Sequence, residues 1–238
     1  MESVNRTEII SCPNARCGQQ LRVPAGEVLM VTCPSCQASF THRPHTQGKR
    51  LSQEFRTKSW TLGELMIAIS RESMTLLKRQ APQALGTLER KQEWEGFIEF
   101  LKVLFNMVDR VATLYIPVSE YLQFLDAVED AVIDQMNNAF RKQAGAGYDE
   151  TPLKVSIAAA FETAQKFYQP HRFMIIDEGP DRDRYLMAFG EAVAQTLGLK
   201  GNKMVVTTAS MCAGSSIAAI KALLESSEGR GPFPSGSA

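Results

Sequence analysis

Apolar residues between about positions 61 and 224 recur every three or four positions, which is the spacing of one face of an α-helix. Prolines and glycines interrupt the pattern, so it predicts separate helices rather than one long one. We predict six helices, over about residues 61–81, 88–115, 119–144, 151–169, 181–197 and 203–224. Each has an apolar stripe that must be buried, so this part of the chain is predicted to be a helical bundle.

Cap residues mark the start of two of these helices. Thr61 followed by Glu64 is a capping-box pattern, which predicts that the first helix begins there. Thr151 followed by Pro152 places a proline at the start of the fourth helix, where its missing N–H costs nothing. The run Arg172–Ile176 is apolar but only five residues long, so it fits a strand, a helical turn or a buried connector.

The N-terminal part follows a different pattern, because four of the five cysteines lie there. Cys12 and Cys17 form one pair, and Cys33 and Cys36 form a second pair of the CxxC type. A short spacer lets both sulfurs of a pair face one point, and two pairs supply the corners of a tetrahedral zinc site. Strand-forming residues precede each pair, and a Pro and a Gly within residues 22–27 predict a turn. We therefore expect two knuckles joined by one short antiparallel sheet.

The metal is expected to be structural. A domain of about 35–40 residues buries too little apolar surface to fold alone, so the ion must supply much of its stability. We predict one Zn²⁺ bound by the four cysteines, which are Cys12, Cys17, Cys33 and Cys36. Free thiols or two disulfides are the alternatives, and His42 or His45 could stand in as a ligand. Because four cysteines close the tetrahedron, catalysis at this metal is not expected.

Residues 7–42 resemble the small zinc-ribbon domains common at the N-termini of bacterial proteins. That family has a CPxCG-type knuckle, an LRVP-like strand, a VxCPxC knuckle and an aromatic residue; this chain has CPNARCGQQLRVPAGEVLMVTCPSCQASF. Here the first knuckle is two residues longer than the commonest form, and Gln37 replaces the glycine usual after the last cysteine, whereas Gly18 is kept. The resemblance implies zinc and a ribbon fold. It does not imply one function, since such ribbons occur in nucleic-acid binders, in assembly factors and as stabilising appendages.

These patterns divide the chain into four parts. Residues 1–42 are predicted to form the zinc ribbon, and residues 59–225 the helical bundle. Residues 43–58 are polar and basic and include a Pro and a Gly, which predicts a flexible linker. Residues 226–238 are rich in Gly, Pro and Ser and are predicted to be a disordered tail. The predicted fold class is a small β zinc ribbon followed by a mainly α-helical domain.

Charge and composition narrow the choice of partners only slightly. The formal net charge is zero, so the overall composition points to neither nucleic acid nor membrane. Residues 1–58 hold eight Lys and Arg against four Asp and Glu, so the ribbon and linker are basic. Clustered cysteines and an N-terminus without an apolar run predict a reducing, cytoplasmic location.

The last predicted helix contains a long uncharged stretch, residues 204–220. Seventeen uncharged residues are at the lower limit for crossing a bilayer, but many of them are Ser, Thr, Ala or Gly. We therefore predict a tightly packed helix of a soluble bundle and no membrane partner. Cys212 would then be an interior, structural residue.

The helical part has no residue pattern that indicates catalysis. Asp126, Asp130 and Asp134 are spaced by four and are expected to form a solvated helix face. Acidic residues around Asp181 and Asp183 are explained by the start of a helix. The sequence contains no Gly-rich phosphate loop, no Ser/His/Asp set and no nucleotide fingerprint.

Three functions are compatible with these features. A closed metal site without catalytic residues favours a non-catalytic interaction, adaptor or regulatory protein, which contacts another protein through Arg16, Arg22 and the exposed strand of the ribbon. Nucleic-acid binding through the basic ribbon and linker is the second, and it would weaken steeply with salt. An enzyme with a pocket among the helices is the third, and it would show as buried Asp, Arg or Tyr converging on a pocket. The oligomeric state does not follow from the sequence.

Overall fold

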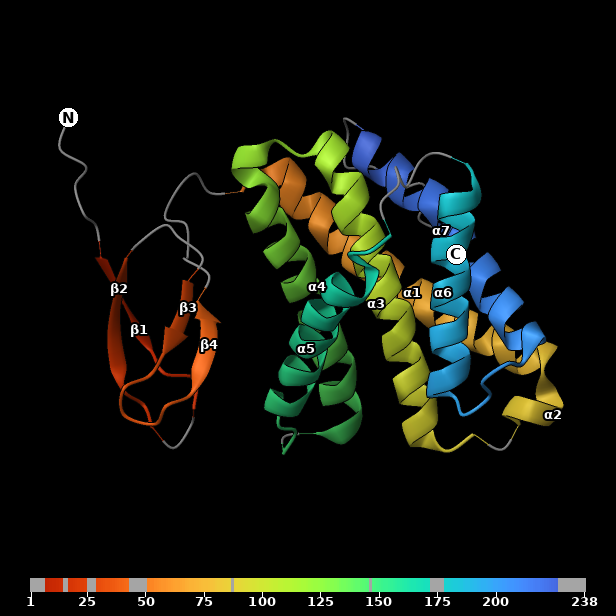
Figure 1. The fold of residues 1–238 in the computed structure, drawn as a ribbon, viewed down its shortest axis with the longest axis horizontal. Coiled ribbons are helices and arrows are strands. Elements are labelled where there is room, and N and C mark those ends of the chain that lie inside the picture. Colours follow the sequence, from red (N-terminus) through yellow and green to blue (C-terminus); the bar gives the residue numbers. More distant parts are fainter. Residues whose placement is uncertain are drawn as a thin grey trace. The chain divides into compact units, whose positions relative to one another are not determined.

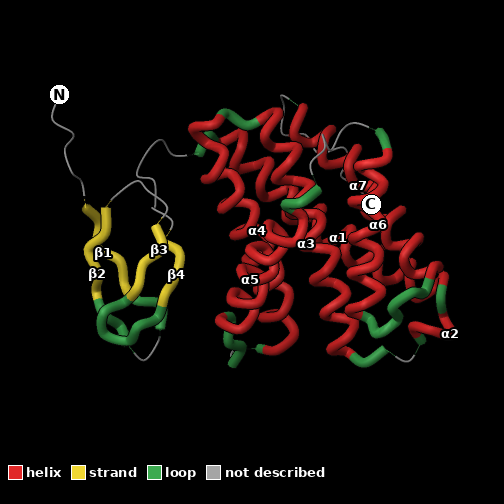
Figure 2. Tube along the Cα trace, in the orientation of Figure 1, coloured by secondary structure: helices red, strands yellow, loops and turns green. Residues whose placement is uncertain are grey.

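The computed structural model describes residues 7–14, 17–24, 29–42, 51–86, 88–145, 147–171 and 178–226. The chain forms two compact units, one within residues 1–50 and one within residues 51–238 (Figure 1). The described strands all belong to the first unit and the described helices to the second (Figure 2). The predicted fold class, a small β unit with a cysteine cluster before a mainly helical domain, is confirmed.

The first unit consists of two β-hairpins. Strand β1 (Thr7–Ser11) pairs antiparallel with β2 (Gln20–Pro24), and β3 (Leu29–Thr32) pairs antiparallel with β4 (Ser39–His42). The prediction of a single sheet is wrong, because the hairpins form two separate sheets. Each cysteine pair forms the loop of its own hairpin, so the strands on either side of a pair bond to each other. Residues 22–24, expected in a turn, complete β2, and residues 25–28 lie outside the described part.

The second unit contains seven helices within its described residues. They are α1 (Gln53–Gln80), α2 (Pro82–Leu85), α3 (Arg90–Tyr115), α4 (Val118–Ala144), α5 (Thr151–Tyr168), α6 (Pro180–Thr196) and α7 (Lys203–Glu225). All six predicted helices are present, and α2 is an additional four-residue helix that starts at Pro82. Residues 172–176, for which the sequence left three possibilities, lie outside the described residues, as does the tail from residue 227.

Helix α1 begins eight residues earlier than its capping-box pattern predicts. Ser52 is the N-cap and accepts a hydrogen bond from the backbone N–H of Phe55 (3.3 Å), as N-cap serines do. Thr61 lies inside the helix instead, where its hydroxyl donates to the Thr57 carbonyl (3.1 Å). Residues 53–58, which we assigned to a flexible linker, are therefore the first turns of this helix.

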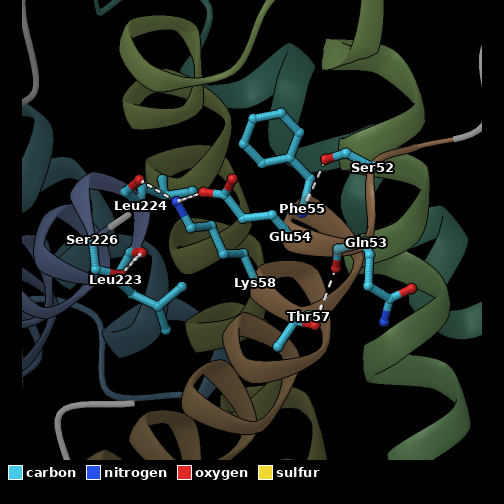
Figure 3. Close-up of polar contacts among 9 residues, drawn as sticks. All are labelled: Ser52, Gln53, Glu54, Phe55, Thr57, Lys58, Leu223, Leu224 and Ser226. Atoms are coloured by element: carbon cyan, nitrogen blue, oxygen red, sulfur yellow. Dashed lines mark hydrogen bonds and ion pairs between the residues drawn. The ribbon is translucent and has the colours of Figure 1, made fainter. Parts of the chain in front are cut away.

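Lys58 explains why this early start is stable. Its ammonium group donates to the Leu224 carbonyl (2.9 Å) near the end of α7 and pairs with the carboxylate of Glu54 (2.8 Å), as Figure 3 shows. Only 4% of Lys58 is exposed. The carbonyls at a helix C-terminus have no partner within the helix and attract cations, so this lysine ties the first long helix to the last. In the sequence, such a lysine cannot be told apart from the polar residues of a linker.

Helix α3 lies at the centre of the core. It packs against α1, α5, α6 and α7, and it has the longest run of buried residues. Its fully buried side chains include Phe100, Leu101, Leu104, Val108 and Val111. The apolar stripe of the helix predicted over residues 88–115 is therefore buried. The other helices cover that face and, along part of α3, its whole circumference.

Helix α7 contains the uncharged stretch, residues 204–220, and it packs against α1, α3 and α6. Its contact with α6 is very close: a Cβ added at Gly190 would lie 2.4 Å from the Val206 carbonyl oxygen. Among the described helices, only α7 is long and apolar enough to cross a membrane, and 50% of that window is buried within the domain. Cys212 is half-buried beside α1 rather than interior, and burial raises the pKa of its thiol. Cys212 lines the groove between α1 and α7.

Candidate metal centre

The two cysteine pairs occupy equivalent places in the two hairpins. The N–H of Cys12 donates to the Gln19 carbonyl (2.8 Å), and the N–H of Cys33 donates to the Ala38 carbonyl (2.9 Å). These hydrogen bonds close the two loops at the ends of the strands. The first loop is two residues longer, as the sequence indicated, and it still closes in the same way. The longer knuckle therefore leaves its cysteines correctly placed.

The structure brings all four predicted cysteines together. The sulfurs of Cys12 and Cys36 are 3.6 Å apart, and those of Cys17 and Cys33 are 3.7 Å apart. All four sulfurs lie within 4.8 Å of one another. A tetrahedral zinc ion with Zn–S bonds of about 2.3 Å places its sulfurs about 3.8 Å apart, so this arrangement fits a metal ion. All five cysteines are free, and a disulfide would require about 2.05 Å between sulfurs.

The electrostatics of the cluster also favour a cation. The Cys33 side chain is fully buried, yet the backbone N–H groups of Cys36 and Ser35 donate to its sulfur and lower its pKa to about 7. Burial raises the pKa of Cys12 to about 12. Four thiolates this close repel one another, so protons stay on most of the sulfurs unless a divalent cation replaces them. No histidine within the described residues joins the cluster; the side chain of His42 and all of His45 lie outside the described part.

Both knuckles end with a residue in the left-handed backbone region. Gly18 has a φ of 59° and Gln37 a φ of 61°, each directly after the second cysteine of its pair. Glycine adopts this conformation without steric cost, whereas an L side chain does not. Gln37 keeps the fold of the knuckle, since its N–H donates to the Cys33 carbonyl (2.9 Å), but it carries strain that Gly18 does not.

Replacing Gln37 by glycine is therefore expected to stabilise the metal-bound ribbon by about 1 kcal/mol. The Gln37 side chain is exposed, so little contact is lost. The change should appear as a gain of about fivefold in zinc affinity in a chelator competition. Ala38→Gly is the matched control: its backbone has no positive φ, so glycine there only adds freedom to the unfolded chain and should weaken binding slightly. A weaker affinity in Gln37→Gly than in the parent protein would contradict this account.

The helical domain contains a buried polar network that the sequence did not reveal. The Asn106 side-chain oxygen accepts hydrogen bonds from the Tyr185 hydroxyl (3.0 Å) and from the Arg110 Nε (2.9 Å). Arg110 also donates to the Tyr168 carbonyl (2.9 Å), and its guanidinium lies over the Tyr185 ring. Burial raises the pKa of both tyrosines, so they stay protonated. The network joins α5 and α6 to α3.

This network connects three helices of the core. Arg and Tyr side chains converge here, as an enzyme would require, but they line neither the cleft between α1, α3 and α4 nor the groove between α1 and α7. Hydrogen bonds within the network occupy the Asn106 oxygen and the Tyr185 hydroxyl, whereas the buried Tyr168 hydroxyl has no partner among the described residues. Spacing along the helices gave no signal for it, because its members come from three helices that are separate in the sequence.

The acidic clusters have the roles that the sequence predicted. Asp126, Asp130 and Asp134 are exposed on α4. Asp181 and Asp183 lie in the first turn of α6, where carboxylates interact favourably with the helix dipole. Arg184 pairs with Asp181 at this helix start. Both groups are therefore explained without a ligand.

No protein-family model, curated protein or solved structure matches this chain. The description of the first unit as ribbon-like therefore rests on the spacing of the four cysteines and on the two knuckles that bring their sulfurs together. Four cysteines in this arrangement can bind a metal ion, and an all-sulfur tetrahedral set is typical of zinc.

Proposed function

We propose that this protein binds one structural Zn²⁺ and acts as a non-catalytic interaction or adaptor protein. The observation that carries the proposal is the cage of four sulfurs from Cys12, Cys17, Cys33 and Cys36. Four protein ligands fill a tetrahedron, so no position remains for a reacting water or substrate. Zinc in such a site holds the fold of its domain, and the function then belongs to the surface that the fold presents.

The surface of the ribbon supports a protein partner. Ile9 is 63% exposed and Met30 is 75% exposed, and each lies three residues before the first cysteine of its knuckle. Exposed Arg22 stands directly opposite Ile9 in the β1–β2 register, so an apolar and a cationic side chain share one face. Exposed apolar residues on so small a unit favour a contact surface for another protein. Arg16, the other contact residue expected from the sequence, lies outside the described residues.

The cytoplasm suits this proposal, because four free thiols keep their capacity to bind metal in a reducing compartment. Nucleic-acid binding remains a separate alternative. It rests on the basic charge of residues 1–58, most of whose cations lie outside the described residues. Its affinity would fall steeply with salt, whereas an apolar protein contact would not.

The proposal is tested by comparing the partners that the tagged full-length protein captures with those of an Ile9→Ser, Met30→Ser variant. We expect the variant to lose the partner proteins while it still contains one zinc per chain. The matched control is Val118→Ser, which removes an apolar side chain that is 95% exposed on the helical domain and should leave the partners unchanged. If deletion of residues 1–45 leaves the captured proteins unchanged, the ribbon is not the contact surface. Captured material that is nucleic acid and is released by moderate salt would support the alternative instead.

A further inference from the structure

The helical domain has a cleft of about 750 Å³ between α1, α3 and α4. Helices α1 and α4 start side by side, where the Ser52 N–H donates to the Glu120 carboxylate (3.0 Å). They are still in close contact at Gly63, where an added Cβ would lie 3.0 Å from the Ala131 Cβ. Beyond that contact the two helices diverge (Figure 1), and side chains from the first turns of α3 line the space between them. The cleft is thus closed at one end.

Aromatic side chains form the lining in the middle of this cleft. The rings of Trp94 and Phe97 are stacked with centroids 5.6 Å apart, and Phe140 from α4 meets Trp94 edge to face at 6.1 Å. All three are only partly buried, and Ile67 and Met136 add aliphatic surface beside them. Apolar and aromatic linings in cavities of roughly 300–1,000 Å³ are typical of small-molecule sites.

Cations outnumber carboxylates on the rim of the cleft. Arg71, Lys78 and Arg90 lie on the rim, together with the carboxylates of Glu64 and Glu93. Lys78 and Glu93 pair with each other at 2.5 Å. Arg71 and Arg90 are exposed, and neither forms an ion pair with any residue that the structure describes. Lys78 and Arg90 stand where α1 ends and α3 begins, which is the end of the cleft away from Gly63.

We propose that this cleft binds an amphiphile of the fatty-acid class. The apolar chain lies on Trp94, Phe97 and Phe140, and the carboxylate lies at the rim with Arg71 and Arg90, which present two unpaired cations to it. The closed end favours a single hydrocarbon chain over an acidic helix from another protein. A helix about 10–12 Å wide would need a groove that continues past the contact between α1 and α4.

Trp94 provides a direct probe of this site. The chain has two tryptophans, so a Trp60→Phe variant of the full-length protein reports Trp94 alone. We expect 6-bromododecanoate to quench this fluorescence saturably below its micellar concentration, because a bromine in the middle of the chain then lies near the ring. Dodecyltrimethylammonium, which has the same chain and the opposite charge, should fail to displace it. Reversal of both rim charges by Arg71→Glu and Arg90→Glu should weaken binding about tenfold or more.

The matched control is Arg79→Glu. Arg79 also lies on α1, but it lines the groove between α1 and α7 and not the cleft. Reversing its charge should change the affinity for the amphiphile by less than about twofold. The Arg71→Glu, Arg90→Glu variant should also gain affinity for dodecyltrimethylammonium, a gain that a misfolded variant could not show. The proposal is overturned if quenching is not saturable, if dodecyltrimethylammonium competes as well as dodecanoate in the parent protein, or if the charge-reversed variant binds neither amphiphile. A site that accepts only an acidic helix would give the first of these results.

Discussion

Replacing Cys33 and Cys36 by serine is expected to unfold the ribbon completely and to leave the helical domain folded. The variant loses two of the four sulfurs, including the fully buried sulfur of Cys33. The described part of the ribbon has only two two-stranded sheets, and Val23 is its one buried aliphatic side chain. Such a unit lacks the core to fold without its metal, for which about 10 kcal/mol or more of binding free energy is typical.

Two measurements on the full-length protein check this expectation. Elemental mass spectrometry should find one zinc per chain in the reduced parent protein and none in the double variant. Amide NMR signals of residues 7–42 should collapse to the unfolded range, while the thermal transition of the helical domain stays where it was. Cys212→Ser is the matched control, because this cysteine lies in the helical domain and should leave the zinc content unchanged. Parent protein without zinc, freshly purified and reduced, would contradict the assignment of the metal site.

A chain that begins at Leu51 is expected to fold as stably as the helical domain of the whole protein, whereas a chain that begins at Ser59 is not. The shorter chain loses the Ser52 cap, the contact of Phe55 with the Phe124 ring (6.2 Å) and the Lys58 bond to α7. Together these amount to about 4 kcal/mol, a large part of the stability of an ordinary domain.

Urea unfolding followed by circular dichroism measures the difference. The 51–238 chain should unfold in one cooperative transition, and the 59–238 chain should unfold at a much lower urea concentration. Lys58→Met in the longer chain isolates one of the three interactions and should cost about 2 kcal/mol, since it leaves the Leu224 carbonyl without its charged donor. Equal midpoints for the 51–238 and 59–238 chains would show that the first turns of α1 contribute nothing.

Local patterns predicted the helices accurately wherever the apolar stripe was continuous. The ends of α5 and α7 lie within one residue of the predicted ends, because a proline and an uncharged run bounded by lysine mark them in the sequence. The start of α1 was missed for the opposite reason. Its first two turns contain a single large apolar residue, Phe55, and a lysine that is buried only through a partner far along the chain.

The acidic residues of α4 and Cys212 show the same difference between what local sequence predicts and what tertiary packing decides. The three carboxylates of Asp126, Asp130 and Asp134 are exposed because they share one helix face, and their spacing of four in the sequence predicts this. The partial exposure of Cys212 depends on how far α1 covers α7, and no pattern in the sequence gives that coverage. The network around Asn106 and the cleft above Trp94 likewise exist only because separate helices meet.

By itself, the sequence determined the helical class of the second unit and the four-cysteine set of the first. Both depend on short-range spacing: the helical repeat in one case, and two close cysteine pairs in the other. Only the tertiary structure decided where α1 begins, how the strands pair and where a cleft opens. The physical reason is that these features depend on contacts between distant residues, such as the hydrogen bond from Lys58 to Leu224 across 166 positions, and no local pattern encodes such a contact.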